Sequence, residues 1–528
     1  MSEPVLLIVG FVAAVALAVV SKRLALPYPI VFVLAGTAAA FVPGLPPVRI
    51  APDWIFLSIL PPLLFSGGWT TDLTLFRANL RPIVLLAVGL VVVSTCVVAA
   101  LAERIVPGLG WAGAFVLGAI VAPPDAIAAI ATFERFSVPR RIVAVLEGEG
   151  LVNDASALVI YAYAVTATIA GGFSLPQAAG SFVLVALGGI ALGVAVVWCV
   201  ERLVRALNRL ELSDSLIDNL VIIATPYVTY VAGETLHVSP VLATVVAGIQ
   251  LGRRSAVIYP PETRLVATNV WQLWIYVINA FVFLAIGLQL RGFVQSGTEA
   301  LTLLPAALAI SALLIGVRLL WVYPAAWIPR ALIPGLAERD PLPSWQEIGL
   351  VGWTGMRGIV SLAAALAIPL TVARGVPFPR RDAIVFITFV VIFVTLIGQG
   401  LSLIPLVRWL RLGRTGERAE REIEVRIAAL EAGLARLDAL GAQADGEQRS
   451  VLDRLREEYR HRIEHLRSHG ARDGPQETEE TRFDHVAQAE ALLAERRAIM
   501  RLRDRGEIPD EIFRTVQYDL DLAESRLF

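Results

Sequence analysis

The chain has 528 residues, of which 56% are hydrophobic and 17% are charged, and its formal net charge is −1. A soluble protein of this length would carry about a quarter charged residues, so the composition excludes an ordinary soluble enzyme. The near-neutral charge gives no indication of a nucleic-acid partner. Two isolated cysteines in apolar stretches predict neither a disulfide framework nor a metal site, and we expect no cofactor.

Long apolar stretches separated by short polar loops predict about thirteen membrane-spanning helices in contact with the lipid bilayer. They lie near residues 4–21, 28–46, 53–69, 82–102, 111–132, 141–171, 177–200, 215–235, 238–252, 265–290, 300–329, 345–371 and 383–407. The first stretch follows only Met-Ser-Glu-Pro, without a basic segment or a cleavage site, so we expect a retained span. The sequence therefore predicts an all-α polytopic membrane protein.

Basic residues are concentrated in alternate loops between these stretches. The rich set is Lys22, Arg23, Arg77, Arg81, Arg135, Arg140, Arg141, Arg202, Arg205, Arg209, Arg253, Arg254, Arg264 and Arg330. Because positively charged loops stay in the cytoplasm, this set predicts an N-terminus outside and a C-terminus inside.

Two of the predicted spans contain helix-disrupting residues at depth. The fifth contains Ala122-Pro-Pro-Asp125, and the twelfth contains Trp353-Thr-Gly-Met-Arg-Gly358. They are seven spans apart and run in opposite directions, which is typical of two inverted repeats with spans 1–6 mirrored by spans 8–13. Freed backbone groups are tolerated in a membrane only where they line a cavity or find partners. Breaks at equivalent places therefore predict a transport site.

The sixth span carries three carboxylates close together, Glu147, Glu149 and Asp154. Placing a carboxylate in the middle of a bilayer costs roughly a few to more than ten kcal/mol, depending on the estimate. Its presence there therefore indicates an ion or proton pathway. On a helix, Glu147 and Asp154 share a face, with Gly150 between them, while Glu149 and Asn153 share a neighbouring face. We expect the first face to line a cavity and the second to anchor another helix.

Further charged residues lie near the two breaks. Asp125 stands at the first break, where unwound carbonyls can also coordinate a cation. Arg357 stands at the second break and is a natural partner for one acid, because an unpaired buried guanidinium is costly. The alternative is a purely structural salt-bridge network, but four acids exceed what Arg357 and Arg318 can pair.

Residues 410–528 are rich in arginine and glutamate, and differ from the preceding membrane domain, residues 1–409. Apolar residues recur at helical spacing in 423–430 and 451–456, which predicts a cytosolic α-helical tail. We expect a linker at 470–476 and two further helices in 485–528, turned at 506–509. The tail contains no catalytic constellation, so a regulatory, dimerising or stabilising role is expected.

Two segments, Leu146-Glu-Gly-Glu-Gly-Leu-Val-Asn-Asp154 and Gly355-Met-Arg-Gly-Ile-Val-Ser-Leu-Ala363, resemble the sodium/proton exchanger family, the first branch of the monovalent cation:proton antiporters. Further matching stretches are Leu60–Phe65, Leu236–Ser239 and Asn279–Phe283, and the tail run Glu495–Glu511 resembles the bacterial subgroup. The resemblance covers all the predicted spans in order.

The resemblance implies a homodimer in the bacterial cytoplasmic (inner) membrane, with an ion-carrying core that moves against a dimerisation domain. It implies that Asp154 carries the cation or the proton, that Asn153 supports it, and that Glu149 pairs with Arg357. The Asn-Asp form, without a core lysine, resembles the electroneutral branch.

The chain departs from the family pattern at the site itself. Gly150 stands where serine is usual, Pro124 where threonine or serine is usual, and Ser66 where an acid is common. A hydroxyl ligand is missing, although the Pro124 carbonyl remains and Glu147 is a substitute from the same helix face. The choice among Li⁺, Na⁺ and K⁺ therefore stays open. The secondary candidates for the site are Ser66, Asn279 and Arg318.

The sequence predicts a secondary antiporter that exchanges a monovalent cation for a proton by alternating access, with both ions competing at Asp154. The alternative from another class is a cation channel, or channel-like sensor, gated by the tail. A membrane-embedded hydrolase using paired acids is a weaker alternative, because no acid or histidine pair has metal-ligand spacing. We therefore expect a transporter without enzymatic activity.

Overall fold

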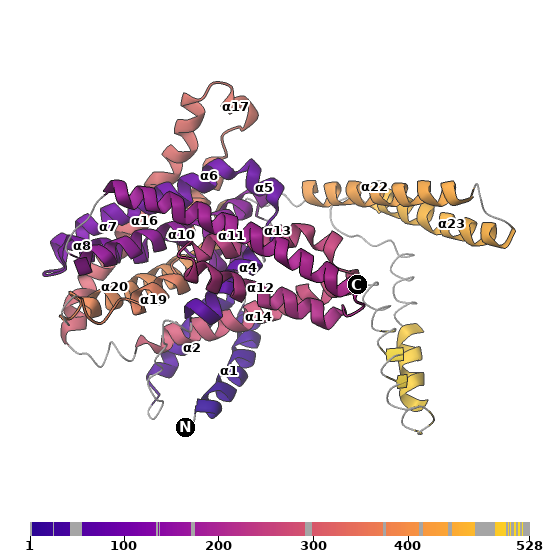
Figure 1. Ribbon diagram of the computed structural model, residues 1–528, viewed down its shortest axis with the longest axis horizontal. Helices are drawn as coiled ribbons and strands as arrows, with labels where there is room; N and C mark the ends of the chain where they lie inside the picture. The colour runs from indigo at the N-terminus through magenta and orange to yellow at the C-terminus, as the bar shows by residue number, and fades with distance from the viewer. Residues whose placement is uncertain are drawn as a thin grey trace. The chain divides into compact units, whose positions relative to one another are not determined.

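The computed structural model describes residues 3–24, 26–42, 55–133, 136, 138–170, 175–290, 298–372, 376–410, 416–441, 446–469 and 491–502, with scattered residues between 505 and 520. Across these residues the fold is helical, apart from one isolated bridge between Thr371 and Pro377 (Figure 1). The chain divides into two compact units, residues 1–413 and 414–528.

The N-terminal half of the first unit leads to the helix that carries the three acids. Its helices are α1 (Glu3–Leu24), α2 (Tyr28–Ala40), η1 (Ile55–Ile59), α4 (Leu60–Thr70), α5 (Leu73–Ala78), α6 (Leu80–Val84), η2 (Leu85–Leu90), α7 (Val91–Ile105), α8 (Gly110–Val121), α9 (Ile127–Phe133) and α10 (Arg140–Ala170). The segments labelled η are π-helices.

The second half of the unit follows through a long helix, α11. Its helices are α11 (Leu175–Arg209), α12 (Ser215–Thr235), α13 (Pro240–Ile258), α14 (Pro261–Leu288), α16 (Thr298–Leu332), α17 (Leu336–Arg339), α18 (Trp345–Trp353), α19 (Ile359–Leu366), α20 (Arg381–Phe393), η4 (Val394–Gln399) and α21 (Gly400–Leu410). Every predicted apolar segment has a helical counterpart. Among the described residues, eight helices are long and apolar enough to cross a membrane, and three shorter apolar helices accompany them.

Several helices begin where local sequence chemistry dictates. Asp214 accepts a hydrogen bond from the Ile217 N–H (2.8 Å) and starts α12. Ser239 accepts from the Leu242 N–H (3.2 Å) and precedes a proline at the start of α13. These side chains satisfy N–H groups that have no partner in the first turn of a helix, so the short loops end abruptly.

Helix α11 extends nine residues beyond the predicted span, to Arg209. The sequence indicated a loop there because of its charges, but Glu201 pairs with Arg205 one turn later (2.9 Å) and with Arg254 of α13. Pairs at this spacing stabilise a helix without apolar burial. Ionic contacts therefore stabilise the part of α11 that extends beyond the apolar segment.

The structure confirms both predicted breaks. Helix α8 ends at Val121 and α9 begins at Ile127, while α18 ends at Trp353 and α19 begins at Ile359. The two breaks meet, since the Asp125 N–H donates to the Met356 carbonyl (2.7 Å). The largest apolar core surrounds them and includes fully buried side chains of α14, α19 and α20. The breaks therefore lie inside protein, where freed backbone groups can find partners.

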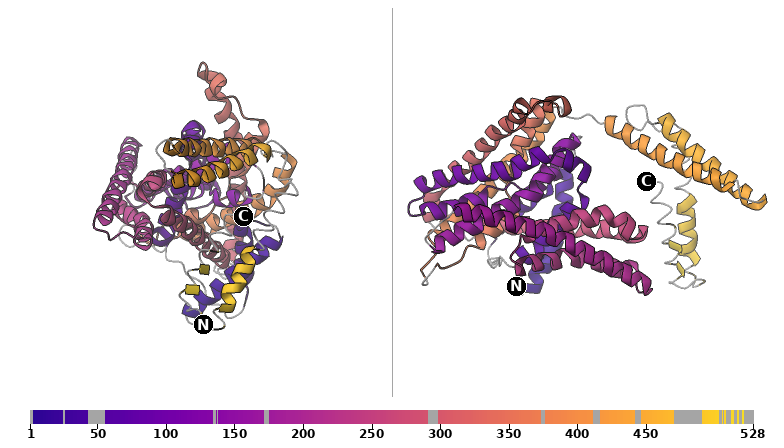
Figure 2. Two further views of the ribbon diagram at one scale, coloured as in Figure 1. Left: turned by 90° about the vertical axis from the view of Figure 1, so that its right-hand side faces the viewer. Right: turned by 45° about the horizontal axis from the view of Figure 1, so that its top comes forward.

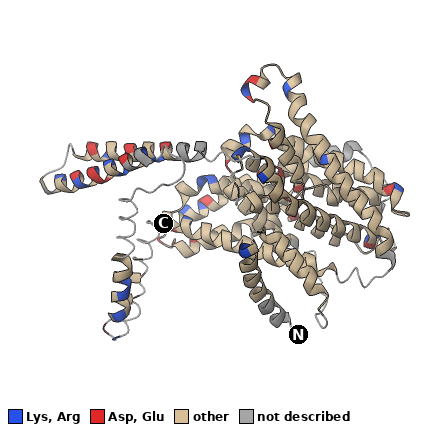
Figure 3. Cartoon of the chain, turned by 180° about the vertical axis from the view of Figure 1, so that it is seen from behind, with Lys and Arg blue, Asp and Glu red and all other residues tan. Residues whose placement is uncertain are grey.

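The second unit contains a hairpin of two helices, α22 (Gly416–Gly441) and α23 (Gly446–His469). Arg456 of α23 pairs with Asp438 of α22 (2.8 Å), and Arg467 pairs with Glu431 (2.5 Å). The two helices run side by side in both views of Figure 2. Figure 3 shows charges of both signs along the hairpin. The linker expected at 470–476 lies outside the described residues, as does most of the turn expected at 506–509.

Candidate functional site

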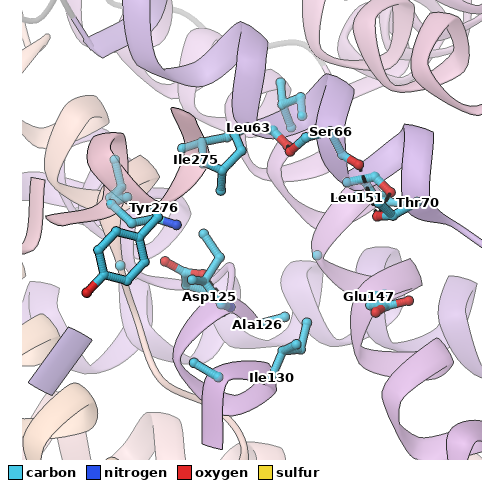
Figure 4. Close-up of a pocket in the computed structure, with 18 of the residues that line it drawn as sticks. Leu63, Ser66, Thr70, Asp125, Ala126, Ile130, Glu147, Leu151, Ile275 and Tyr276 are labelled. Atoms are coloured by element: carbon cyan, nitrogen blue, oxygen red, sulfur yellow. Dashed lines mark hydrogen bonds between the residues drawn. The ribbon is translucent and has the colours of Figure 1, made fainter. Parts of the chain in front are cut away.

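A cavity of about 1020 Å³ opens among α1, α4, α10, α14 and the two breaks. Figure 4 shows Asp125 and Glu147, from different elements, among its lining residues, with Tyr276 on the side of Asp125 away from Glu147. The cavity brings together these residues predicted from the sequence: Ser66, Pro124, Asp125, Glu147, Gly150, Asp154 and Asn279. Among the described residues, no group of three or more His, Cys, Asp or Glu side chains is arranged to hold a metal ion.

Asp154 of α10 is half-buried and lines this cavity. Its carboxylate has no hydrogen bond or ion pair to any described residue. Gly150 lies one turn earlier on the same face, as its spacing predicted. A Cβ atom at Gly150 would lie 3.4 Å from the Ala126 Cβ, which is ordinary contact, so the wall has room for a small side chain there. Asp154 thus presents an unpaired carboxyl group to the cavity.

Asn153, the neighbour of Asp154, is buried and bonds to the first break. Its Nδ2 donates to the Pro124 carbonyl (2.7 Å), so the amide fixes α10 against the unwound segment. Its Oδ1 is buried and has no partner among the described residues. The supporting role expected of Asn153 is consistent with this contact, and the Pro124 carbonyl is engaged by it.

Asp125 faces the beginnings of two half-helices. Its carboxylate accepts a hydrogen bond from the Ile127 N–H at the start of α9 (2.9 Å), and another from the Ile359 N–H at the start of α19. A helix N-terminus carries a partial positive charge, which the carboxylate balances. A Cβ atom at Gly358 would overlap this carboxylate, so the close approach requires glycine.

Arg357 faces the opposite ends of the interrupted helices. Its Nε donates to the carbonyl of Val121, the last residue of α8 (2.7 Å), and its Nη1 donates to the Gly355 carbonyl just after α18. Helix C-termini carry partial negative charge, which the guanidinium balances. Asp125 and Arg357 therefore neutralise the positive and negative helix ends at the crossing.

The predicted pair between Glu149 and Arg357 is wrong. Glu149 instead forms a two-pronged pair with Arg318 of α16, with Nη–Oε distances of 2.5 and 2.8 Å. The two side chains are only 2% and 1% exposed. Arg318 also donates from Nε to the Val351 carbonyl (3.1 Å).

The physical reason is competition for donors. The carbonyls freed by the breaks occupy the guanidinium of Arg357, while the planar fork of Arg318 matches a carboxylate. A single arginine in the middle of the apolar helix α16 was the available signal, because such a charge needs a buried partner.

Glu147 lies two helical turns before Asp154, a rise of roughly 10 Å. One dehydrated cation cannot contact both carboxylates across that distance. Ser66, on the α4 wall, donates from Oγ to the Leu63 carbonyl (3.1 Å) and leaves its lone pairs available. Glu147 and Ser66 line the same cavity as Asp154.

Asn279 of α14 lies on another wall of the cavity and donates from Nδ2 to the Tyr28 hydroxyl (3.2 Å). Its Oδ1 is buried without a partner among the described residues. Lining residues that sequence reasoning missed include Tyr28, Tyr276 and Lys22. Their positions depend on how α1, α2 and α14 pack, which local spacing does not specify.

Residues 10–409 match the family described as sodium/hydrogen exchanger, transmembrane. A protein of Mycobacterium tuberculosis, named an uncharacterized Na⁺/H⁺ exchanger, is 32% identical over 98% of this chain and 95% of its own. A sodium, potassium, lithium and rubidium/H⁺ antiporter of Bacillus subtilis is 30% identical over 93% of this chain and 73% of its own.

The solved structure of a sodium proton antiporter from Methanocaldococcus jannaschii, at pH 8, has the same fold. Its TM-score is 0.57 at 18% identity, and the likeness covers 76% of this chain and all of that one.

Proposed function

This chain belongs to the sodium/hydrogen exchanger family, and we propose that Asp154 is its exchange site. The protein is a multi-pass membrane antiporter that exchanges a monovalent cation for a proton. The family match spans the membrane unit and favours exchange over a tail-gated channel.

The observation that carries the proposal is the unpaired carboxylate of Asp154 on the cavity wall. A single negative charge is neutralised by one proton or by one monovalent cation, and not by both together. Asn153 holds α10 to the first break, so the ion contacts Asp154 beside an unwound segment. Alternating access of this site to the two sides of the membrane then couples the two fluxes.

Asp125 supports the site from across the cavity, where its carboxylate is already held by backbone N–H groups. We assign it to completing the cation shell while it balances the helix ends. Glu147 is a separate binding point in the same cavity, where its carboxylate attracts cations before they reach Asp154. Both roles follow from positions along one cavity.

The loop charges support a cavity mouth on the cytoplasmic side, since Lys22 and Thr70 line the cavity near the ends of α1 and α4. We propose that this conformation is open to the cytoplasm, with the N-terminus outside and the second unit inside. In this proposal the protein is a homodimer of the bacterial inner membrane, and residues 410–528 form a regulatory or dimerising tail.

The absence of a side chain at Gly150 leaves the site with one hydroxyl ligand fewer, so the bound ion keeps more water. A larger, more weakly hydrated ion then competes better, which supports K⁺/H⁺ exchange beside Na⁺/H⁺ exchange. The Bacillus subtilis relative, named for sodium, potassium, lithium and rubidium, supports the same breadth.

The test is Asp154→Asn in proteoliposomes, with internal pH followed under imposed Na⁺ or K⁺ gradients. We expect complete loss of exchange with no loss of thermal stability, because the substitution preserves shape and removes an unpaired charge. Glu262→Gln is the matched control, since Glu262 is exposed at the start of α14 and does not line the cavity. Cation-driven proton movement at the wild-type rate in Asp154→Asn would refute the assignment.

A further inference from the structure

The break between α18 and α19 leaves backbone groups without helical partners. Buried N–H and C=O groups need other partners, since each one left unpaired is costly. The Asp125 N–H satisfies the Met356 carbonyl, and the side chain of Arg357 satisfies the Gly355 carbonyl. The Trp353 carbonyl accepts from the Gly355 N–H (2.9 Å) and has a second lone pair free for a side chain, while the Arg357 N–H still needs a side-chain partner.

Both partners come from η4, the π-helical turn between α20 and α21. Gln399 donates from Nε2 to the Trp353 carbonyl (2.8 Å). Thr395 accepts from the Arg357 N–H at Oγ1 (3.0 Å) and donates its own proton to the Val391 carbonyl (2.7 Å). The two side chains are 1% and 0% exposed.

These contacts fix both sides of the unwound segment. Trp353 is the last residue of α18, and Arg357 directly precedes Gly358, against which the Asp125 carboxylate lies. The Arg357 N–H thus sets where its guanidinium meets the Val121 carbonyl at the other break. Neither Thr395 nor Gln399 lines the cavity, so each acts on the site only through the break.

The local sequence is consistent with a dedicated role. Thr395 and Gln399 are polar residues on an otherwise apolar, buried segment, where burying an unpaired polar group costs free energy. π-Helical turns are frequent at functional sites because the inserted residue re-aims side chains. Here the turn presents both side chains to the backbone of the neighbouring break.

We propose that Thr395 and Gln399 are positioning residues for ion exchange, which hold the break between α18 and α19 in the geometry that presents Asp125 to the cation. The proposal rests on the exchange function assigned to Asp154. It predicts that losing either contact alters cation binding in folded protein, beyond any effect on stability.

The test compares Thr395→Val, which keeps the shape and removes the hydroxyl, with Thr395→Ser, which keeps the hydroxyl. Gln399→Met keeps the approximate length and removes the donor. The measurement is the Na⁺ dependence and pH profile of exchange in proteoliposomes that contain equal amounts of folded protein. We expect roughly a tenfold rise in apparent KM in Thr395→Val and Gln399→Met, the size of one lost buried hydrogen bond. Thr395→Ser should stay near wild type.

Ser402→Ala is the matched control. Ser402 accepts a hydrogen bond from the Trp353 indole Nε1 (3.0 Å), so it links the same helices without touching the backbone of the break. Its loss should leave KM and the pH profile unchanged.

Wild-type KM and pH profile in Thr395→Val and Gln399→Met, even with lowered stability, would overturn the proposal and leave a structural role only. If Thr395→Val fails to fold, Thr395→Ala and Gln399→Met carry the same decision. Wild type and Asp154→Asn are measured alongside. An inert wild type, or an active Asp154→Asn, would defeat the assigned function, whereas failure of the positioning role leaves both of these as expected.

Discussion

Two of the carboxylates of helix α10, five residues apart, lie in opposite environments. Glu149 is buried and forms a two-pronged pair with Arg318. Asp154 lines the cavity and has no partner among the described residues. The residues share a helix, a charge and a membrane depth within two turns. Their comparison teaches that the partner, and not the acidic group itself, separates a structural carboxylate from one available to ions.

The largest effect is expected from breaking the pair, since Arg318→Ala turns Glu149 into an unpaired buried acid. Removing one partner of a buried pair costs about 3–5 kcal/mol, so thermal unfolding in detergent should occur at much lower temperature. The double variant Glu149→Gln with Arg318→Met should recover most of that loss, because no charge remains buried alone. A double variant no more stable than Arg318→Ala would show that packing, and not charge, holds these helices together.

A second variant displaces Asp125, another acid that lines the cavity. A methyl group at Gly358 would overlap the Asp125 carboxylate, so Gly358→Ala must displace it. Overpacking of this kind costs about 1–3 kcal/mol, and we expect exchange to fall with stability. Gly150→Ala is the control, because its Cβ would meet Ala126 only at ordinary contact distance. Normal exchange in Gly358→Ala would mean that the position of Asp125 matters little.

A third acid, Asp340, extends the comparison to the water-exposed edge, outside the spans. Arg141 (2.6 Å), Arg330 (2.8 Å) and Arg81 all pair with its carboxylate. Partial burial raises its pKa, but the hydrogen bond and charge of Arg141, together with Arg330, outweigh this and hold the pKa below its usual value. The stabilisation is therefore present at neutral pH and is lost as the pH falls through the native pKa.

Asp340→Asn should cost about 1 kcal/mol at neutral pH, as expected for a partly solvated cluster. Thermal unfolding of both proteins between pH 7 and about 3 tests this, since the difference should stay constant above about pH 5 and shrink below about pH 4. A difference that persists undiminished in acid would point to the shape of the loop instead of its charge.

The smallest effect is expected at Gly150, where a hydroxyl would give Asp154 a neighbouring ligand. Gly150→Ser should raise the apparent Na⁺ affinity a few-fold over Gly150→Ala, in line with about 1 kcal/mol for one hydrogen-bond-like contact. Concentration dependence of exchange with Na⁺ and K⁺ measures it. Equal Na⁺ affinity in the two variants would indicate that water or another side chain already fills that place.

Local patterns predicted the helices, both breaks and the shared face of Asp154 and Gly150, because each depends on spacing along one segment. The partner of Glu149 was not predictable in this way. Arg318 and Arg357 are equally able to pair with an acid, and the choice depends on which carbonyls the crossing leaves unpaired. The contacts that η4 makes with the break between α18 and α19 were not predictable for the same reason, since Thr395 and Gln399 contact a segment far away in sequence.

The charge balance at the crossing has an electrical consequence. One elementary charge moved through the whole membrane field is worth about 2.3 kcal/mol per 100 mV. Asp125 and Arg357 offset each other, as do Glu149 and Arg318, so the crossing offers the field little net charge to act on. Asp154 with one bound proton or one bound monovalent cation is also neutral. With Asp154 as the proposed exchange site, we expect the loaded site to change sides in either direction with little dependence on membrane voltage, so that the ion gradients set the direction of net exchange.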